Sequence, residues 1–225
     1  MRVLIACEES QRVCIAFRDR GHEAYSCDIQ PCSGGHPEWH IQGDALIAMR
    51  GGFIHLQDGS TVCVDNWDMM IGHPPCTYLS NAGNRYFNID RFGSKAEKRM
   101  IDRLSAAQFF MDMYTANIPR IYLENPVGFI NGWLKPTQVV EPYFFGDSEK
   151  KKTCLWLKGL PKLIHHRTDN LFGSRTHIEI KPTYVDKSGK SRYFTDSISG
   201  TNPEAQKLRS KTFPSIAKAM ADQWG

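Results

Sequence analysis

Short apolar runs alternate with amphipathic segments along much of the chain, and this alternation is the strongest constraint on its fold. The first run, residues 2–7 (RVLIAC), is typical of a strand that is buried on both faces. Residues 10–21 follow with apolar side chains at helical spacing, between Ser10 as a helix cap and Gly21 as a helix end. The pattern therefore opens with a strand and a helix that packs on it.

Further strands are expected at 23–29, within 62–72 and at 120–126. Between the last two, a capping box at 94–97 (SKAE) predicts a helix start. The expected buried face of that helix is formed by Leu104, Ala107, Met111 and Tyr114. Strands that alternate with helices predict an α/β fold with a doubly wound parallel sheet and helices on both faces.

The composition agrees with one medium domain. With 41% hydrophobic residues among 225, the chain can bury a sizeable core. The first ten residues are too short and too acidic for a signal peptide, and no apolar run is long enough for a membrane span. We therefore expect a cytoplasmic protein without membrane contact. The expected oligomeric state is a monomer or a weak dimer. Seven cysteines without a C-x-x-C pair argue against a disulfide framework or a zinc ribbon, and no metal site is expected.

Positive charge is concentrated near the C-terminal end of the chain. Residues 150–211 hold 14 Lys and Arg against 5 Asp and Glu, whereas the rest of the chain is net acidic. A basic segment on an acidic body is typical of a protein that binds a polyanion. We therefore expect this segment to bind a polyanion, with a strong dependence on salt.

Polar or reactive residues stand at or just after the ends of the expected strands. These residues are Cys7, Asp28, Cys76 and Glu124. Two prolines in the stretch GHPPC stiffen the backbone directly before Cys76, and Pro126 stops the strand that carries Glu124. Ligands of doubly wound sheets bind at the carboxyl ends of the strands, so this edge is the expected site.

A thiol opposite a carboxyl group suits one chemistry in particular. A thiolate that adds to carbon 6 of cytosine breaks the aromaticity of the ring, and a carboxyl group at ring nitrogen 3 stabilises the product. Carbon 5 can then attack an electrophilic methyl group, which combines covalent with acid catalysis.

The motifs PPC (74–76) and ENP (124–126) resemble those of the cytosine-5 DNA methyltransferases, which use S-adenosylmethionine. The resemblance follows the family's motif order over nearly the whole chain, in a short form with a reduced target-recognition region. It implies DNA, duplex or single-stranded, as the partner of the basic segment, read with little sequence specificity. It implies Cys76, Glu124 and Asn125 as catalytic residues. The substrate-binding residues that it implies are Ser80, Asn81, Lys151 and Lys152.

The resemblance also implies a binding site for S-adenosylmethionine in a Rossmann-like methyltransferase sheet with a small basic appendage. Its expected residues are Ala6, Cys7, Glu8, Ser10, Asp28, Ile29, Asp44, Ala45, Pro74 and Ser210. The loop IACEES (5–10) lacks the glycines that are usual in the family's first motif. The expected boundaries are a catalytic and donor-binding core at 1–160, a recognition segment at 161–208 and a returning helix at 209–225.

Three other functions remain compatible with these residues. An amino-methyltransferase would need an Asn or Asp before the prolines and an aromatic residue after them, which HPPC lacks. A cytosine methyltransferase that acts on free nucleotides would need no DNA contact. The missing glycines of the first motif would also suit a DNA- or donor-binding module without catalysis.

Overall fold

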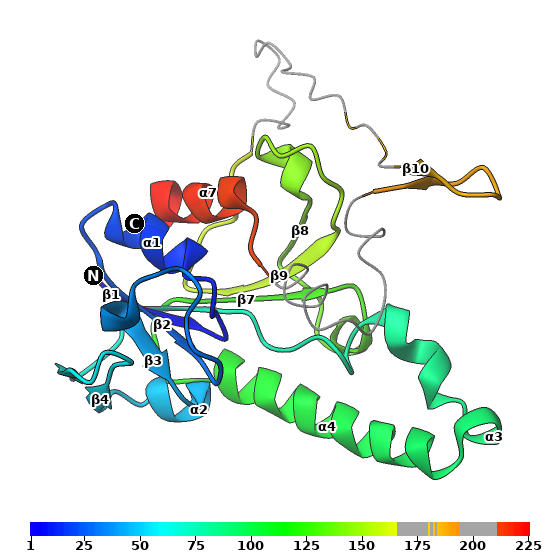
Figure 1. The fold of residues 1–225 in the computed structure, drawn as a ribbon, viewed down its shortest axis with the longest axis horizontal. Helices are drawn as coiled ribbons and strands as arrows, with labels where there is room; N and C mark the ends of the chain where they lie inside the picture. The colour runs from blue at the N-terminus through cyan, green and yellow to red at the C-terminus, as the bar shows by residue number, and fades with distance from the viewer. Residues whose placement is uncertain (166–179, 181, 183, 194–210) are drawn as a thin grey trace.

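The computed structural model describes residues 1–165, 180, 182, 184–193 and 211–225. The first helix and the C-terminal helix lie on one side of a central sheet, and the longest helix lies on the other (Figure 1). The sheet consists, in spatial order, of β3 (His40–Gln42), β2 (Glu23–Asp28), β1 (Arg2–Ala6), β6 (Met69–Gly72), β7 (Ile121–Pro126), β9 (Thr153–Lys158) and β8 (Gln138–Val140).

Six of these strands run in one direction and one, β9, runs in the opposite direction. From β3 to β7 every pairing is parallel, whereas β9 pairs antiparallel with both β7 and β8. The chain runs outward from β1 to β2 and β3, and then returns to the other side of β1 with β6 and β7. The strand order thus reverses beside β1, at the switch point of a doubly wound sheet. The predicted α/β fold class, a doubly wound and mostly parallel sheet with helices on both faces, is confirmed.

The helices follow the strands in alternation. They are α1 (Arg12–Arg18), α2 (Ala45–Ala48), α3 (Ile89–Phe92), α4 (Ser94–Tyr114) and α7 (Pro214–Trp224), together with the 3-10 helices η1 (Pro37–Trp39), η2 (Asn81–Phe87), η3 (Phe129–Gly132) and η4 (Pro142–Phe144). Two small hairpins, β4 (Gly52–His55) with β5 (Thr61–Val64) and β10 (Tyr184–Val185) with β11 (Ser191–Arg192), complete the described elements. None of the described helices combines the length and the apolarity needed to cross a bilayer.

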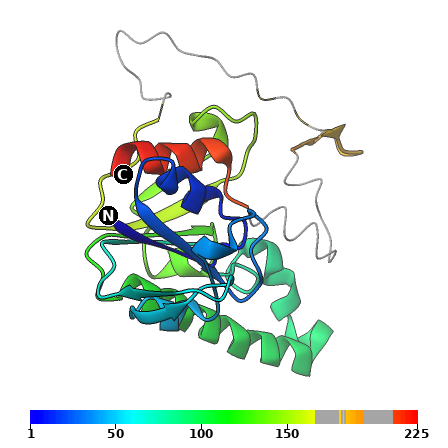
Figure 2. The same cartoon turned by 60° about the vertical axis from the view of Figure 1, so that its left-hand side comes forward.

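Each face of the sheet has its own core, because successive side chains of a strand point to opposite faces. Val3 and Ile5 of β1 belong to the cluster under α1 and α7, whereas Leu4 and Ala6 belong to the cluster under α4. Figure 2 shows the sheet between these two helix layers. The C-terminal helix buries Ile216, Met220 and Trp224, as its spacing predicts.

Two predicted features of the long helix α4 are wrong. Gly93, not Ser94, occupies the cap position of α4, and no side chain caps this helix, so the capping box does not form. Leu104 is exposed, and the buried residues of α4 are Ala96, Ala107, Phe110 and Met113. The N-terminal half of α4 extends beyond the sheet (Figure 1), so spacing alone could not show which of its apolar residues find a core.

The loop that follows β6 is tied to the loop that follows β7. Ser80 and Gly128 form an isolated β-bridge, and the backbone N–H of Phe129 donates to the carbonyl of Leu79 at 2.7 Å. A Cβ atom on Gly128 would overlap this carbonyl oxygen. Gly128 has an extended φ of −178°, so the position needs glycine for close approach and not for its backbone conformation.

The substitution Gly128→Ala should therefore separate the two loops. We expect it to lower the free energy of unfolding by ~1–3 kcal/mol, the usual cost of overpacking, in urea denaturation. Gly132→Ala is the matched control, because a Cβ atom there meets nothing within 4 Å. Equal effects of the two substitutions would contradict the assignment of the close contact.

Candidate active site

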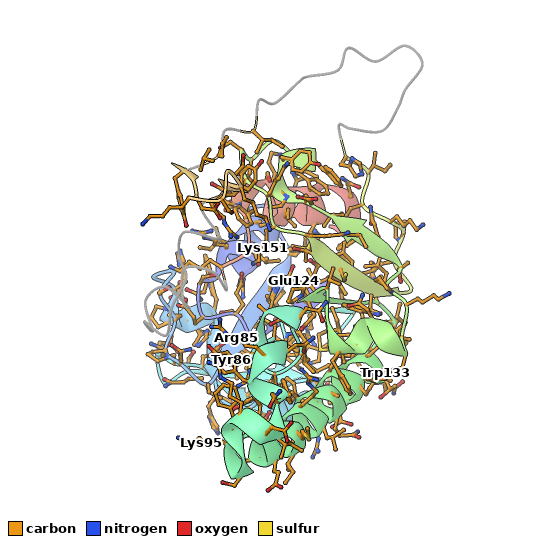
Figure 3. The ribbon with its side chains drawn as sticks, turned by 90° about the vertical axis from the view of Figure 1, so that its right-hand side faces the viewer. Arg85, Tyr86, Lys95, Glu124, Trp133 and Lys151 are labelled. Atoms are coloured by element: carbon orange, nitrogen blue, oxygen red, sulfur yellow. The ribbon has the colours of Figure 1, made fainter. Side chains whose placement is uncertain are left out.

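The register of the parallel strands sets the geometry of the candidate site. Ala6 pairs with Cys27 on one side and with Gly72 on the other, and Gly72 pairs with Leu123. The next residues of these strands therefore lie in one row along the carboxyl edge of the sheet, in the order Asp28, Cys7, His73 and Glu124. Figure 3 looks onto this edge, with Glu124 near its centre and Lys151 above it.

Glu124 is held by two buried partners. His73 Nδ1 lies 3.2 Å from Glu124 Oε1, and the Tyr122 hydroxyl donates to Glu124 Oε2 at 2.8 Å. The side chains of His73 and Glu124 are only 7% and 14% exposed, and Tyr122 is fully buried beneath Trp224 of α7. The carboxylate is thus oriented from both sides and leaves only a small part of its surface open.

The ionisation of the pair follows from opposing effects. Burial alone would raise the pKa of Glu124, but His73, Lys151 and the Tyr122 hydroxyl outweigh it and hold that pKa at about 2. Burial would likewise lower the pKa of His73, but Glu124 and Glu8 more than compensate and raise it above its usual value. Both shifts favour the charged forms, so the pair favours a carboxylate beside an imidazolium.

Asn125 joins the glutamate strand to the proline–cysteine loop. Its buried side-chain Nδ2 donates to the carbonyl of Pro74 at 2.9 Å and to that of Glu124 at 2.8 Å. One amide group thus connects Pro74, two residues before Cys76, with the backbone of Glu124. This bond brings the predicted nucleophile and the predicted acid to the same part of the edge.

Helix α4 supports the loop that carries Cys76. Arg99 donates to the carbonyl of Thr77, and Arg103 donates to that of Tyr78, both at 2.9 Å. Cys76 itself is exposed at the start of this loop. The predicted substrate residues Ser80 and Asn81 follow it, and both also take part in the backbone contacts with the loop after β7.

The loop between β1 and α1 makes its turn without glycine. Cys7 and Gln11 adopt positive φ angles of 61° and 58°, which are uncommon for residues with a side chain. The buried Gln11 side chain donates to the carbonyl of His36 at 2.8 Å and to Ser26 Oγ at 3.2 Å, which holds the loop in place. Sparsely populated backbone conformations of this kind concentrate at functional sites.

Ser10 does not cap α1, contrary to the prediction. The carboxylate of the buried Glu8 accepts hydrogen bonds from the backbone N–H groups of Val13 at 2.8 Å and Cys14 at 3.2 Å. Gln11 occupies the cap position without a side-chain bond. An acid within the strand-to-helix loop thus replaces the serine, because the positive φ of Gln11 turns the chain back on itself.

The remaining predicted donor residues lie around the ends of β1, β2 and β3. Asp28 is half-buried and accepts from the backbone N–H of Gln30, and the Ile29 side chain is 77% exposed beside it. Asp44 is exposed and caps α2 by accepting from the backbone N–H of Leu46, so it has a structural role. Ala6 and Ala45 are buried.

The predicted basic residues lie at the same edge of the sheet, because β9 runs antiparallel to β7. Lys151 and Lys152 directly precede β9, and Lys152 is exposed. Lys151 influences the pKa of both Glu124 and His73. Ser210 and most of the predicted recognition segment lie outside the described residues. Among the described side chains, no group of three or more His, Cys, Asp or Glu is placed to hold a metal ion.

Sequence reasoning missed His73 and Tyr122. His73 stands between Gly72 and the prolines, where the strand ends. Tyr122 precedes Glu124 by two residues, which in a strand places both side chains on one face. In the sequence, these two spacings were the signals that His73, Tyr122 and Glu124 form one group.

The ion pair predicts how stability depends on pH. The pKa of Glu124 is about 2 in the folded protein and about 4.3 when unfolded, so its contribution is complete above the latter value and is lost as the pH falls through the former. His73 also stabilises the fold, but with the opposite pH dependence. Its contribution is complete below about pH 6.5 and is lost as the pH rises through its raised pKa.

Glu124→Gln removes the anion, so the His73 imidazolium loses its counter-ion and gives up its proton more readily. We expect it to lower the free energy of unfolding by ~2–3 kcal/mol between about pH 4.3 and 6.5, and by less on either side, in denaturation series at fixed pH. The exposed Glu97→Gln on α4 serves as the control. A loss that does not vary with pH would show that the two groups are not coupled.

Comparisons with known proteins add little to this geometry. No family model matches the sequence, and no curated protein matches it. A solved structure, described as a "putative DNA modification methyltransferase" encoded within a prophage of E. coli, aligns with a TM-score of 0.39 and 13% identity over 70% of this chain. The aligned part spans 46% of that chain. Similarity at this level carries no argument about function, which therefore has to rest on the site itself.

Proposed function

We propose that the chain is an S-adenosylmethionine-dependent methyltransferase that methylates carbon 5 of cytosine in DNA through a covalent adduct with Cys76. The observation that carries the proposal is the bond from Asn125 to the Pro74 carbonyl. It connects a thiol on a stiff loop with a strand-end carboxylate, at the edge where ligands of such sheets bind. These are the groups that the chemistry of cytosine requires.

Cys76 and Glu124 have complementary roles in the proposed reaction. Cys76 as a thiolate adds to carbon 6, and Glu124 assists at ring nitrogen 3, so that carbon 5 becomes nucleophilic. The exposed position of Cys76 suits a nucleophile that must reach a base outside the DNA stack. Asn125 does not need to touch the base in this scheme, because its amide holds the two segments together.

The other end of the row suits the methyl donor, which supplies the electrophilic methyl group. Asp28, at the end of β2, is placed to accept from ribose hydroxyls, as strand-end acids do in nucleotide-binding folds. The exposed Ile29 offers an apolar surface beside it. Cys7 adopts the left-handed turn that glycine usually makes, so the missing glycines do not prevent the loop from turning there.

DNA is the proposed substrate on the basis of charge. The basic residues of 150–211 begin at Lys150 and Lys151, and Lys151 lies close enough to Glu124 to lower its pKa. A cation beside the reactive carboxylate suits a substrate that carries phosphates. The exposed Arg85, which Figure 3 shows on the same face below Glu124, adds a second cation.

DNA that contains 5-fluorocytosine tests the nucleophile. Because the fluorine at carbon 5 cannot leave, we expect the wild-type protein with S-adenosylmethionine to form an adduct that survives denaturing electrophoresis. Cys76→Ser should abolish the adduct. Cys63→Ser, at an exposed cysteine of β5, should leave it unchanged. An adduct with the Cys76→Ser variant would falsify the assignment, and reaction with the free nucleotide but not with DNA would change the substrate.

The donor site can be tested without turnover. Asp28→Ala should weaken binding of S-adenosylmethionine by about 10- to 100-fold, as expected for the loss of hydrogen bonds to a charged group, in isothermal titration calorimetry. Asp58→Ala, in the exposed turn between β4 and β5, is the control. Equal affinity in the Asp28→Ala variant and the wild type would remove Asp28 from the donor site.

A further inference from the structure

His73 is an enclosed ionisable group of the site, and the mechanism above does not use it. Its side chain is 7% exposed and its Nδ1 lies 3.2 Å from Glu124 Oε1. Both ring nitrogens are buried, and neither makes a hydrogen bond of good geometry with a described residue, so Nδ1 meets Glu124 at ion-pair distance and Nε2 meets no polar partner. A buried imidazole with one side against a carboxylate and the other unpartnered is costly unless it serves a purpose.

The charged and titratable groups around His73 come from several elements. Glu8 faces it from the loop between β1 and α1, Glu124 and Tyr122 face it from β7, and Lys151 faces it from the segment before β9. Glu124 and Glu8 raise the pKa of His73 and the Lys151 ammonium group lowers it, although burial also raises the pKa of Glu8 itself. Their balance favours the imidazolium, even though its burial opposes a charge.

Glu124 alone cannot supply the proton that the proposed chemistry needs. Ring nitrogen 3 of cytosine accepts hydrogen bonds, and so does an ionised carboxylate, so neither group brings a proton to the contact. With a pKa of about 2, Glu124 is ionised at neutral pH. A proton must therefore reach the carboxylate from a neighbour before nitrogen 3 can be protonated.

We infer that His73 holds the proton that Glu124 delivers to ring nitrogen 3 of the target cytosine. This inference rests on the proposed function and names the proton source of the same site. His73 acts through Glu124 and does not touch the base, so it is a positioning residue for the acid. The contact between Nδ1 and Oε1 is the path of the proton, and Tyr122 keeps the other carboxylate oxygen in place.

The step is balanced without any other reactant. As the bond between Cys76 Sγ and carbon 6 forms, the electron pair of the ring moves toward nitrogen 3. His73 Nδ1 gives its proton to the Glu124 carboxylate, and Glu124 passes it on to nitrogen 3, so that the thiolate and the imidazolium are both neutralised. After methyl transfer the proton on carbon 5 leaves to water and the bond from sulfur to carbon 6 breaks. The proton on nitrogen 3 then returns to His73 through Glu124.

The pH dependence of adduct formation tests the inference. His73 must be protonated at the start, so the rate of adduct formation with 5-fluorocytosine DNA should fall as the pH rises through its pKa. His73→Asn keeps an N–H donor near the Nδ1 position but does not titrate. We expect it to slow adduct formation by about 10²-fold or more and to remove this alkaline decline, with unchanged affinity for S-adenosylmethionine.

His55→Asn, at an exposed histidine of β4, is the matched control and should retain the wild-type profile. Nitrogen-15 NMR of the imidazoles adds a readout that does not need turnover, and in the wild-type protein it needs no variant. His73 should be doubly protonated at neutral pH, and Glu124→Gln should lower its pKa. A neutral His73 at pH 7, or an unchanged pH profile in His73→Asn, would overturn the inference while the proposed function stands. A wild-type protein that forms no adduct would overturn the proposed function and the inference with it, and NMR would then show whether the pair is only structural.

Discussion

Parallel pairing of β1 with β2 and β6, and of β6 with β7, sets the level at which each of these strands ends. Because the four ends are level, the residues that follow form a row, and the row runs from Asp28 to Glu124. A slip of one residue in any strand would turn its last side chain to the other face of the sheet. The buried apolar residues on both faces resist such a slip, so the core of the protein also fixes the spacing of the site.

Charged side chains are buried in this row and directly beside it. Neighbouring hydrogen-bonding and charged groups offset the energetic cost of burying them. The backbone N–H groups at the start of α1 satisfy the carboxylate of Glu8. The Glu124 carboxylate has an imidazolium and a phenol as partners. An arrangement of this kind is weak evidence for stability, since apolar residues would pack as well. The presence of this buried ion pair at the carboxyl edge of the sheet is better explained by chemistry than by folding.

Much of this organisation could be predicted from the sequence, because apolar periodicity reports burial directly. The strands that end at Asp28 and Gly72, the stop at Pro126 and the apolar face of the C-terminal helix follow from that signal. The short strand β3 and the hairpin of β4 and β5 could not be predicted, since they depend on pairing partners that are distant in the chain or weakly patterned.

The same limit applied to single side chains. Ser10 has the local chemistry of a helix cap, but the turn at Gln11 gives that function to Glu8. The ion pair of His73 with Glu124 joins residues of two neighbouring strands, and no local pattern encodes such a contact.

The bridge between Ser80 and Gly128 has a mechanical consequence for the site. With Asn125 bonded to Pro74 on one side of Cys76 and this bridge on the other, the loops after β6 and β7 are joined at both ends of the reactive segment. The two arginines of α4 that hold the carbonyls of Thr77 and Tyr78 add a third attachment. These attachments oppose any change in the separation of Cys76 and Glu124, so the two groups of the proposed reaction depend on the same set of loop contacts.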